Sequence, residues 1–185
     1  MKNALYALIF FCTVSVPICT AQSTLESQIQ LTDDALAKYA STHSVPDLRK
    51  SLKPLLMIRL PNDKANETYL PRVTGLWIEL FKAVDNAYDP TFDPQQRPVL
   101  IDAPRNPDRP ESAQEVANRE LLQKATDYWS LKALDDNATA AFKLFVRYHY
   151  REPSERGHLR EIFTQQALSP QRIEHILPLQ SPVLR

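Results

Sequence analysis

Glycine is the residue that this 185-residue chain most clearly lacks, because only Gly75 and Gly157 occur, where about 7% would be usual. Phosphate-cradling loops, dinucleotide fingerprints and the glycine-serine-glycine turn around a nucleophilic serine each need several glycines, since the backbone there must approach a ligand or adopt positive φ. The sequence therefore excludes these motifs. Tight β-hairpins, whose favoured turns depend on glycine, are disfavoured as well.

Cysteine is equally rare, and both copies, Cys12 and Cys19, lie in an N-terminal segment that is typical of a signal peptide. A lysine near the start precedes a continuous apolar run over residues 5–16, and small residues follow up to Ala21. The run is shorter than the roughly 20 apolar residues that a membrane-spanning helix needs. We therefore expect residues 1–21 to be a signal peptide.

Cleavage after Ala21 would leave residues 22–185 as a single cysteine-free domain, which is long enough to bury its own core. We expect this domain to be secreted or periplasmic and to have no membrane span. Without cysteine it can have no thiol nucleophile, redox pair or thiolate metal site. The alternative is a lipid anchor on Cys19, although the residues before it, Val16-Pro17-Ile18, lack the small side chain that such signals place there.

The chain has no excess of charge, with 22 basic and 22 acidic residues. A nucleic-acid-binding protein would normally show a strongly basic face, so we expect no nucleic-acid partner. The balance is uneven locally. Residues 89–136 hold ten acids against six bases, and residues 143–185 hold seven bases against four acids. We interpret these regions as two solvated faces of a neutral protein.

Apolar residues recur at helical spacing along most of the chain, which predicts an all-α bundle of about six helices. The clearest helix covers residues 72–88. Its Trp77 and Phe81 are interpreted as core residues rather than as an aromatic ligand box. Thr32 is expected to cap one helix, and Asp135-Asp136-Asn137 to end one helix and begin the next.

Three boundaries are harder to place. Residues 142–150 alternate apolar and polar side chains, which allows a short strand, but they also carry a helical stripe. Helix is the prediction there, because no neighbouring segment offers a strand partner. Residues 62–70 are polar and are expected to form a connection. Asp108 is expected to cap the helix that follows the proline-rich stretch.

That stretch, residues 89–110, contains six prolines and no glycine. Proline removes backbone donors and favours extended chain, so no helix is expected to cross it. A free linker would be polar throughout. This stretch has apolar residues, and we expect it to be a strap packed across the helices and anchored by Phe92, Val99, Leu100 and Ile101. Its candidate contacts for a partner are Arg97, Arg105 and Arg109.

The C-terminal third holds the other candidate binding residues, which are Arg147, Arg151, Arg156, Arg160 and His158. Arginine forks match phosphate and carboxylate groups, so this cluster is a candidate contact for an anion or a partner. Glu155 and His158 have the spacing of half a di-metal motif, but the second half and the additional glutamates are missing. We expect no metal and no cofactor.

These features predict an exported, non-catalytic helical domain that binds a protein or another component of the cell envelope or extracellular space. One alternative is a small hydrolase-like enzyme in which His149, His158 or His175 acts as a base beside a carboxylate. Another is a carrier of apolar ligands, which only the aromatic content suggests.

Overall fold

The computed structural model describes residues 16–60, 63–100 and 109–178 of the chain. Within these ranges the chain forms six α-helices and no β-strand, which confirms the all-α prediction. The helices are α1 (Val16–Thr42), α2 (Val45–Met57), α3 (Asp63–Ala87), α4 (Ala113–His149), α5 (Pro153–Gln165) and α6 (Pro170–Ile176). Most of the expected signal peptide lies outside the described residues, and residues 16–21 belong to the start of α1.

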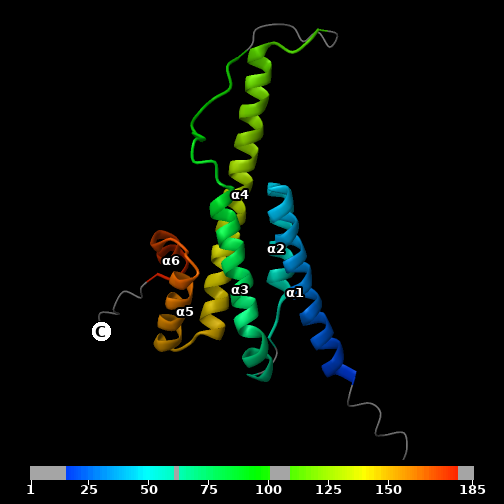
Figure 1. Ribbon diagram of the computed structural model, residues 1–185, viewed down its shortest axis with the longest axis vertical. Helices are drawn as coiled ribbons and strands as arrows, with labels where there is room; N and C mark the ends of the chain where they lie inside the picture. Colours follow the sequence, from blue (N-terminus) through cyan, green and yellow to red (C-terminus); the bar gives the residue numbers. More distant parts are fainter. Residues whose placement is uncertain (1–15, 61–62, 101–108, 179–185) are drawn as a thin grey trace, which may run out of the picture.

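Helices α3 and α4 form the centre of the molecule, with α1 and α2 on one side and α5 and α6 on the other (Figure 1). The core is aromatic. Phe142 of α4 has its ring centroid 5.5 Å from those of both Trp77 and Phe81 on α3. Phe163 of α5 lies 5.6 Å from the same ring. All four side chains are at most 2% exposed, and rings of this size bury enough apolar area to provide much of the stability.

The apolar face predicted within residues 72–88 is the buried face of α3. Ile78 lies off that face and is also buried, so α3 is covered on more than one side, as a central helix should be. The polar connection expected over residues 62–70 is wrong, because α3 already begins at Asp63. Tyr69 and Leu70 pack partly against the core, and this tertiary contact outweighs the polarity of the surrounding sequence.

Two predicted helix boundaries are absent because the polar residues have partners inside the fold. Thr32 lies in the middle of α1, fully buried, where its hydroxyl donates to the Gln28 carbonyl oxygen at 2.8 Å. A threonine whose hydroxyl is satisfied within its own helix can face a core without capping anything. Likewise α4 continues through Asp135, because that carboxylate accepts a hydrogen bond from Arg172 of α6.

The strand considered for residues 142–150 is also wrong, since α4 continues to His149. Phe142 and Val146 face the core, whereas Leu144 is 67% and Tyr148 61% exposed. The alternation in the sequence therefore reflects two different apolar surfaces on one helix, only one of which is buried by the bundle.

Helix α4 has 37 residues, a length of about 55 Å at 1.5 Å per residue, and its first half extends beyond the other helices (Figure 1). We call residues 113–130 the arm, and none of its side chains is buried. The helix begins at a capping box rather than at Asp108, which lies outside the described residues. The Ser112 hydroxyl accepts from the Glu115 amide at 3.3 Å, and the Glu115 carboxylate accepts from the Ser112 amide at 2.7 Å.

Residues 89–100, the described first part of the strap, run beside the arm (Figure 1). Phe92 is half-buried against Tyr128, with ring centroids 5.4 Å apart. The Asn118 amide group bonds both the N–H and the C=O of Val99, at 3.0 and 2.6 Å. The predicted anchoring by the side chains of Val99 and Leu100 is wrong, because they are 57% and 95% exposed. The backbone is held instead, and Ile101 lies outside the described residues.

The chain turns between helices without glycine. His43 after α1 and Ala167 after α5 have φ of 50° and 60°, a left-handed conformation that glycine adopts most easily. At the end of α5 the Ala167 amide donates to the Thr164 oxygen at 3.0 Å and the Leu168 amide to the Phe163 oxygen at 3.1 Å. This is a Schellman motif with alanine at the usual glycine position.

Arg172 joins α6 to both central helices. Its guanidinium donates to Asp85 of α3 and to Asp135 of α4, and its side chain is only 8% exposed. Burial disfavours the charged form and by itself lowers the pKa of Arg172. The hydrogen bonds to the two carboxylates and their negative charges together raise the pKa by more than burial lowers it. The pKa of Arg172 therefore lies above its ordinary value. The arginine therefore stays charged and serves as a structural cross-link.

Candidate functional site

A groove of about 840 Å³ lies between the end of α2 and the last turns of α4. It is lined by Leu55, Leu56, Ile58, Arg59, Leu60, Trp77, Ala141, Leu144, Phe145, Arg147, Tyr148, His149 and Arg151. No carboxylate is among them. The groove is thus apolar with basic residues added, and we take it as the candidate site.

The local sequence explains how α2 forms one wall. The helix ends at Met57, and Ile58 has an extended backbone, with φ −63° and ψ 126°. Ile58 and Leu60 are buried, which turns the chain back toward the core. Arg59 between them stays exposed and donates to the carbonyl oxygens of Leu56 and Ile58, at 2.7 and 3.0 Å. These bonds hold the Arg59 guanidinium at the end of α2.

The floor of the groove is continuous with the core. Trp77, 2% exposed, has its ring centroid 6.2 Å from that of Phe145, which is half-buried. The indole Nε1–H of Trp77 is buried without an acceptor among the described residues. A buried tryptophan N–H usually has a partner, so within the described residues the fold leaves this polar group of Trp77 unpaired.

Three arginines surround this floor, and we call Arg59, Arg147 and Arg151 the rim arginines. None of them is in an ion pair with a carboxylate among the described residues. Arg151 donates to the Tyr148 carbonyl oxygen at 3.2 Å, and its guanidinium carbon lies 5.5 Å from the centre of the Tyr148 ring. The aromatic face orients the cation without neutralising it.

His149 contributes shape rather than charge to the groove. Its ring centroid lies 4.8 Å from that of Phe145 and 4.7 Å from that of Tyr148. Burial, and secondly the positive charge of Arg151, lower the pKa of His149 below its ordinary value. The imidazole is therefore uncharged at neutral pH, and the positive charge of the groove comes from its arginines.

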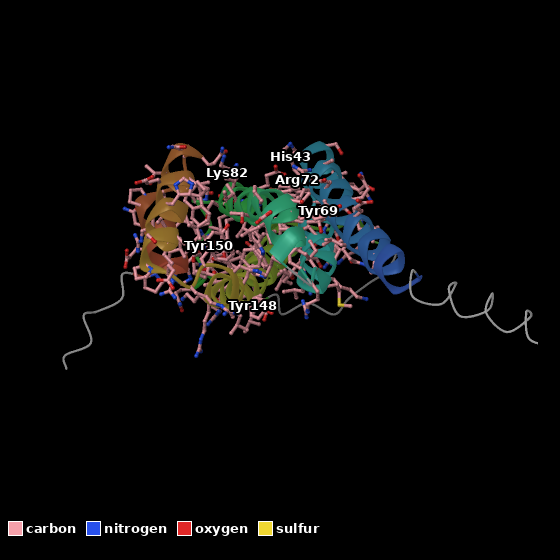
Figure 2. The ribbon with its side chains drawn as sticks, turned by 90° about the horizontal axis from the view of Figure 1, so that it is seen from below. His43, Tyr69, Arg72, Lys82, Tyr148 and Tyr150 are labelled. Carbon is pink, nitrogen blue, oxygen red and sulfur yellow. The ribbon has the colours of Figure 1, made fainter. Side chains whose placement is uncertain are left out.

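One side of the groove is open to solvent along its apolar residues. Leu56, Leu144 and Tyr148 are 38%, 67% and 61% exposed. Tyr148 lies on the opposite side of the molecule from His43 and Lys82 (Figure 2). A hollow of about 630 Å³ next to those two residues also contains Asp33 and Glu79, so it carries charges of both signs. Exposed apolar side chains beside unpaired arginines distinguish the groove from that second hollow.

The structure divides the predicted cluster Arg147, Arg151, Arg156 and Arg160 between two neighbouring hollows. Arg147 lines both. Arg156 and Arg160 line a smaller hollow of about 370 Å³ with Lys143, but both are engaged in the fold. Arg156 donates to the Tyr150 oxygen at 2.8 Å, and Arg160 to Glu174 at 3.1 Å and to the Leu177 oxygen.

The remaining candidates do not converge on either hollow. His158 is exposed on α5, with its Nδ1 3.6 Å from Glu161. Glu155 accepts from the Glu152 amide at 2.9 Å in a capping box, so it is committed to the start of α5. Among the described residues no three histidine, cysteine, aspartate or glutamate side chains are grouped closely enough to hold a metal ion.

The strap arginines differ from one another. Arg97 is exposed beside the arm, whereas Arg109 forms two bonds with the Glu115 carboxylate, at 2.7 and 3.1 Å. Arg109 thus reinforces the cap of α4. Arg105 lies outside the described residues.

Two residues of the groove were missed by the sequence reasoning. Arg59 stands alone between apolar residues and belongs to no cluster in the sequence. Trp77 was correctly predicted as core, yet nothing in its helical pattern indicates that it also reaches a surface groove. The sequence did contain one sign of the groove. The apolar alternation over residues 142–150 marks a second apolar face on α4.

Comparison of the chain with known proteins finds no family, no curated protein and no solved structure that matches it. None of the described helices combines the length and the hydropathy that crossing a membrane would require.

Proposed function

We propose that this chain is an exported, non-catalytic binding domain that takes an acidic, amphipathic helical segment of a partner protein in the groove between α2 and α4. The observation that carries the proposal is the combination of an apolar floor with three rim arginines that have no carboxylate partner in the described chain. Helix-in-groove recognition uses such a floor for the apolar face of the incoming helix.

The charges lie where such a helix would meet them. Arg59 follows the end of α2, whereas Arg147 lies in the last turn of α4 and Arg151 just after it, so the cations come from both helices that border the groove. A helix with its apolar face on Trp77 and Leu144 would place flanking acidic side chains near these guanidinium groups. Arginine is suited to this role because its planar fork binds carboxylates through two parallel bonds.

The open side of the groove favours a protein segment over a small apolar ligand. An acyl chain bound here would stay partly in water, because Leu144 and Tyr148 are more than half exposed. An amphipathic helix can leave its polar face in water at no cost. The hydrolase-like alternative has less support, since His158 and Glu161 are both more than 70% exposed and lie outside the groove.

The test is recovery of partners by the tagged chain, with quantification of each recovered protein. The double variant Arg147→Glu and Arg151→Glu should lower recovery of the groove partner by roughly tenfold or more, because like charges then face its acids. Lys82→Glu is the control, since Lys82 lies on the opposite face from Tyr148 (Figure 2) and its bond to Gln166 is long, at 3.4 Å.

Leu144→Asp tests the apolar half of the same proposal, with Leu31→Asp as its control on α1. Both leucines are more than half exposed, so neither change should unfold the chain. The proposal is wrong if the groove variants recover the same proteins in the same amounts as their controls.

A further inference from the structure

The smaller of the two hollows that Arg147 lines, with a volume of about 370 Å³, is formed by the last turns of α4, by α5 and by the end of α6. We call it the basic hollow, because four cations line it and no carboxylate does. Lys143 and Arg147 come from α4, and Arg156 and Arg160 come from α5. A hollow lined by charge of one sign attracts ions of the opposite sign.

This arrangement of cations disfavours the fold unless a ligand neutralises it. On each helix the two cations are four residues apart, which places them on one helix face, and like charges at that spacing destabilise a helix. Of the four, only Arg160 is in an ion pair with a carboxylate among the described residues, that of Glu174 at 3.1 Å. The described part of the chain therefore leaves the other three positive charges without an acidic partner.

Hydrogen-bond donors remain available in the basic hollow. Lys143 and Arg147 are exposed and form no hydrogen bond within the described residues. Arg156 is held in place, because its Nε donates to the Tyr150 oxygen at 2.8 Å and its Nη2 to the Arg151 oxygen at 3.2 Å. These bonds leave the Nη1 donors of Arg156 for a ligand. A guanidinium that is already fixed loses less conformational entropy when a ligand binds.

The opposite part of the lining is apolar. Val146, Ile176 and Leu177 are 6%, 0% and 6% exposed. Buried apolar side chains lower the local dielectric, which strengthens the attraction between an anion and the nearby cations. The same side chains can contact the carbon atoms of a ligand, and the volume of the basic hollow is in the range of pockets that hold small organic molecules.

We propose that the basic hollow binds the phosphate group of an organic phosphate monoester, with the carbon part of the ligand against the apolar side chains. Arginine and lysine both bind phosphate. A phosphate monoester carries about two negative charges at neutral pH, so it offsets the three unpaired cations better than a carboxylate does. The site is separate from the groove and does not depend on the proposed function. A soluble ester and a phospholipid headgroup present the same chemistry.

The test uses one probe for each source of the phosphate. Phenyl phosphate is titrated into the purified chain by calorimetry at low salt, and phosphatidylcholine vesicles with and without phosphatidic acid are sedimented with the chain. Lys143→Gln and Arg147→Gln should each weaken binding by roughly tenfold, because each removes a charge-assisted hydrogen bond. Both side chains are exposed, so neither change should unfold the chain, and circular dichroism checks this.

Lys82→Gln is the matched control. Lys82 lines the hollow of about 630 Å³ that also contains Asp33 and Glu79, so the same substitution there should leave phosphate binding unchanged. Arg151→Gln is a second comparison, because Arg151 lines the groove and Lys143 does not.

The two probes give distinct outcomes. Phenyl phosphate binding that Lys143→Gln weakens supports a soluble ester as the ligand. Binding to the phosphatidic acid vesicles alone, with the same dependence on Lys143, supports a lipid headgroup. The proposal is overturned if neither probe binds, or if Lys82→Gln weakens binding as much as Lys143→Gln does. It is also overturned if Arg151→Gln abolishes binding that Lys143→Gln leaves unchanged, because the phosphate then lies in the groove.

Discussion

At the scale of single residues, the ion-pair cross-link of Arg172 is expected to stabilise the fold. Its side chain is 8% exposed and bonds two carboxylates on different helices. Arg172→Ala should lower the free energy of unfolding by about 2–4 kcal/mol, because it leaves two partly buried carboxylates without their cation. Urea denaturation of both proteins measures the difference.

Lys132→Ala is the control for that substitution. Lys132 pairs with Asp136 at 3.3 Å, but both side chains are about half exposed, so its loss should change stability by less than about 0.5 kcal/mol. If Arg172→Ala and Lys132→Ala have equal small effects, the cross-link contributes nothing to the fold.

A second residue-scale prediction concerns where glycine is used. Gly157 lies inside α5, where an added Cβ would meet no atom within 4 Å, while the left-handed position after the same helix holds exposed Ala167. Gly157→Ala should stabilise the protein by about 0.5–1 kcal/mol through helix propensity. Ala167→Gly should add about 1 kcal/mol by removing the strain of positive φ. Thermal or urea unfolding measures both, and a loss of stability in either variant would contradict this account.

At the scale of elements, the strap is held through its backbone, so we expect that introducing a charge at its most exposed leucine has little effect on stability. Leu100→Asp should be nearly silent in urea denaturation, because the Leu100 side chain is 95% exposed. Asn118→Ala should leave global stability almost unchanged but speed hydrogen exchange at the Val99 amide, since it removes that amide's acceptor. A large destabilisation by Leu100→Asp would show that the leucine is covered in solution.

The helices themselves show what could and could not be predicted from the sequence. The apolar face of α3 was predictable because six of its residues repeat at helical spacing. Thr32 and Asp135 were predicted as helix boundaries because a polar residue in the sequence has the same local pattern in two situations. Its side chain can cap the end of a helix, or it can form a hydrogen bond from within a helix. Only the partner in the folded chain separates the two cases, which is the Gln28 carbonyl of the same helix for Thr32 and Arg172 of α6 for Asp135.

The groove could be predicted only in part for a related reason. Arg147 and Arg151 were candidates because they belong to a cluster in the sequence. Arg59 lies 88 residues before Arg147, and its position depends on how α2 ends against α4. Burial of Val99 and Leu100 was inferred from their hydropathy, which cannot show that a side-chain amide already holds the backbone.

At the scale of the whole molecule, we predict that export removes residues 1–21 as a signal peptide. Intact mass of the protein recovered outside the cytoplasm should correspond to a chain that begins near Gln22. Recovery of the full-length chain from the cytoplasm alone would contradict it. A mass increase at Cys19 would indicate the lipid-anchored alternative.

The contrast between a buried α3 and an uncovered arm also gives the molecule two intrinsic optical reporters. Its two tryptophans are Trp77 in the core, 2% exposed, and Trp129 on the arm, 55% exposed. Fluorescence emission should therefore have a blue-shifted component that iodide does not quench and a red-shifted component that it does. Loss of the quenchable component would report the covering of the arm, and a red shift of the other would report unfolding, without any label.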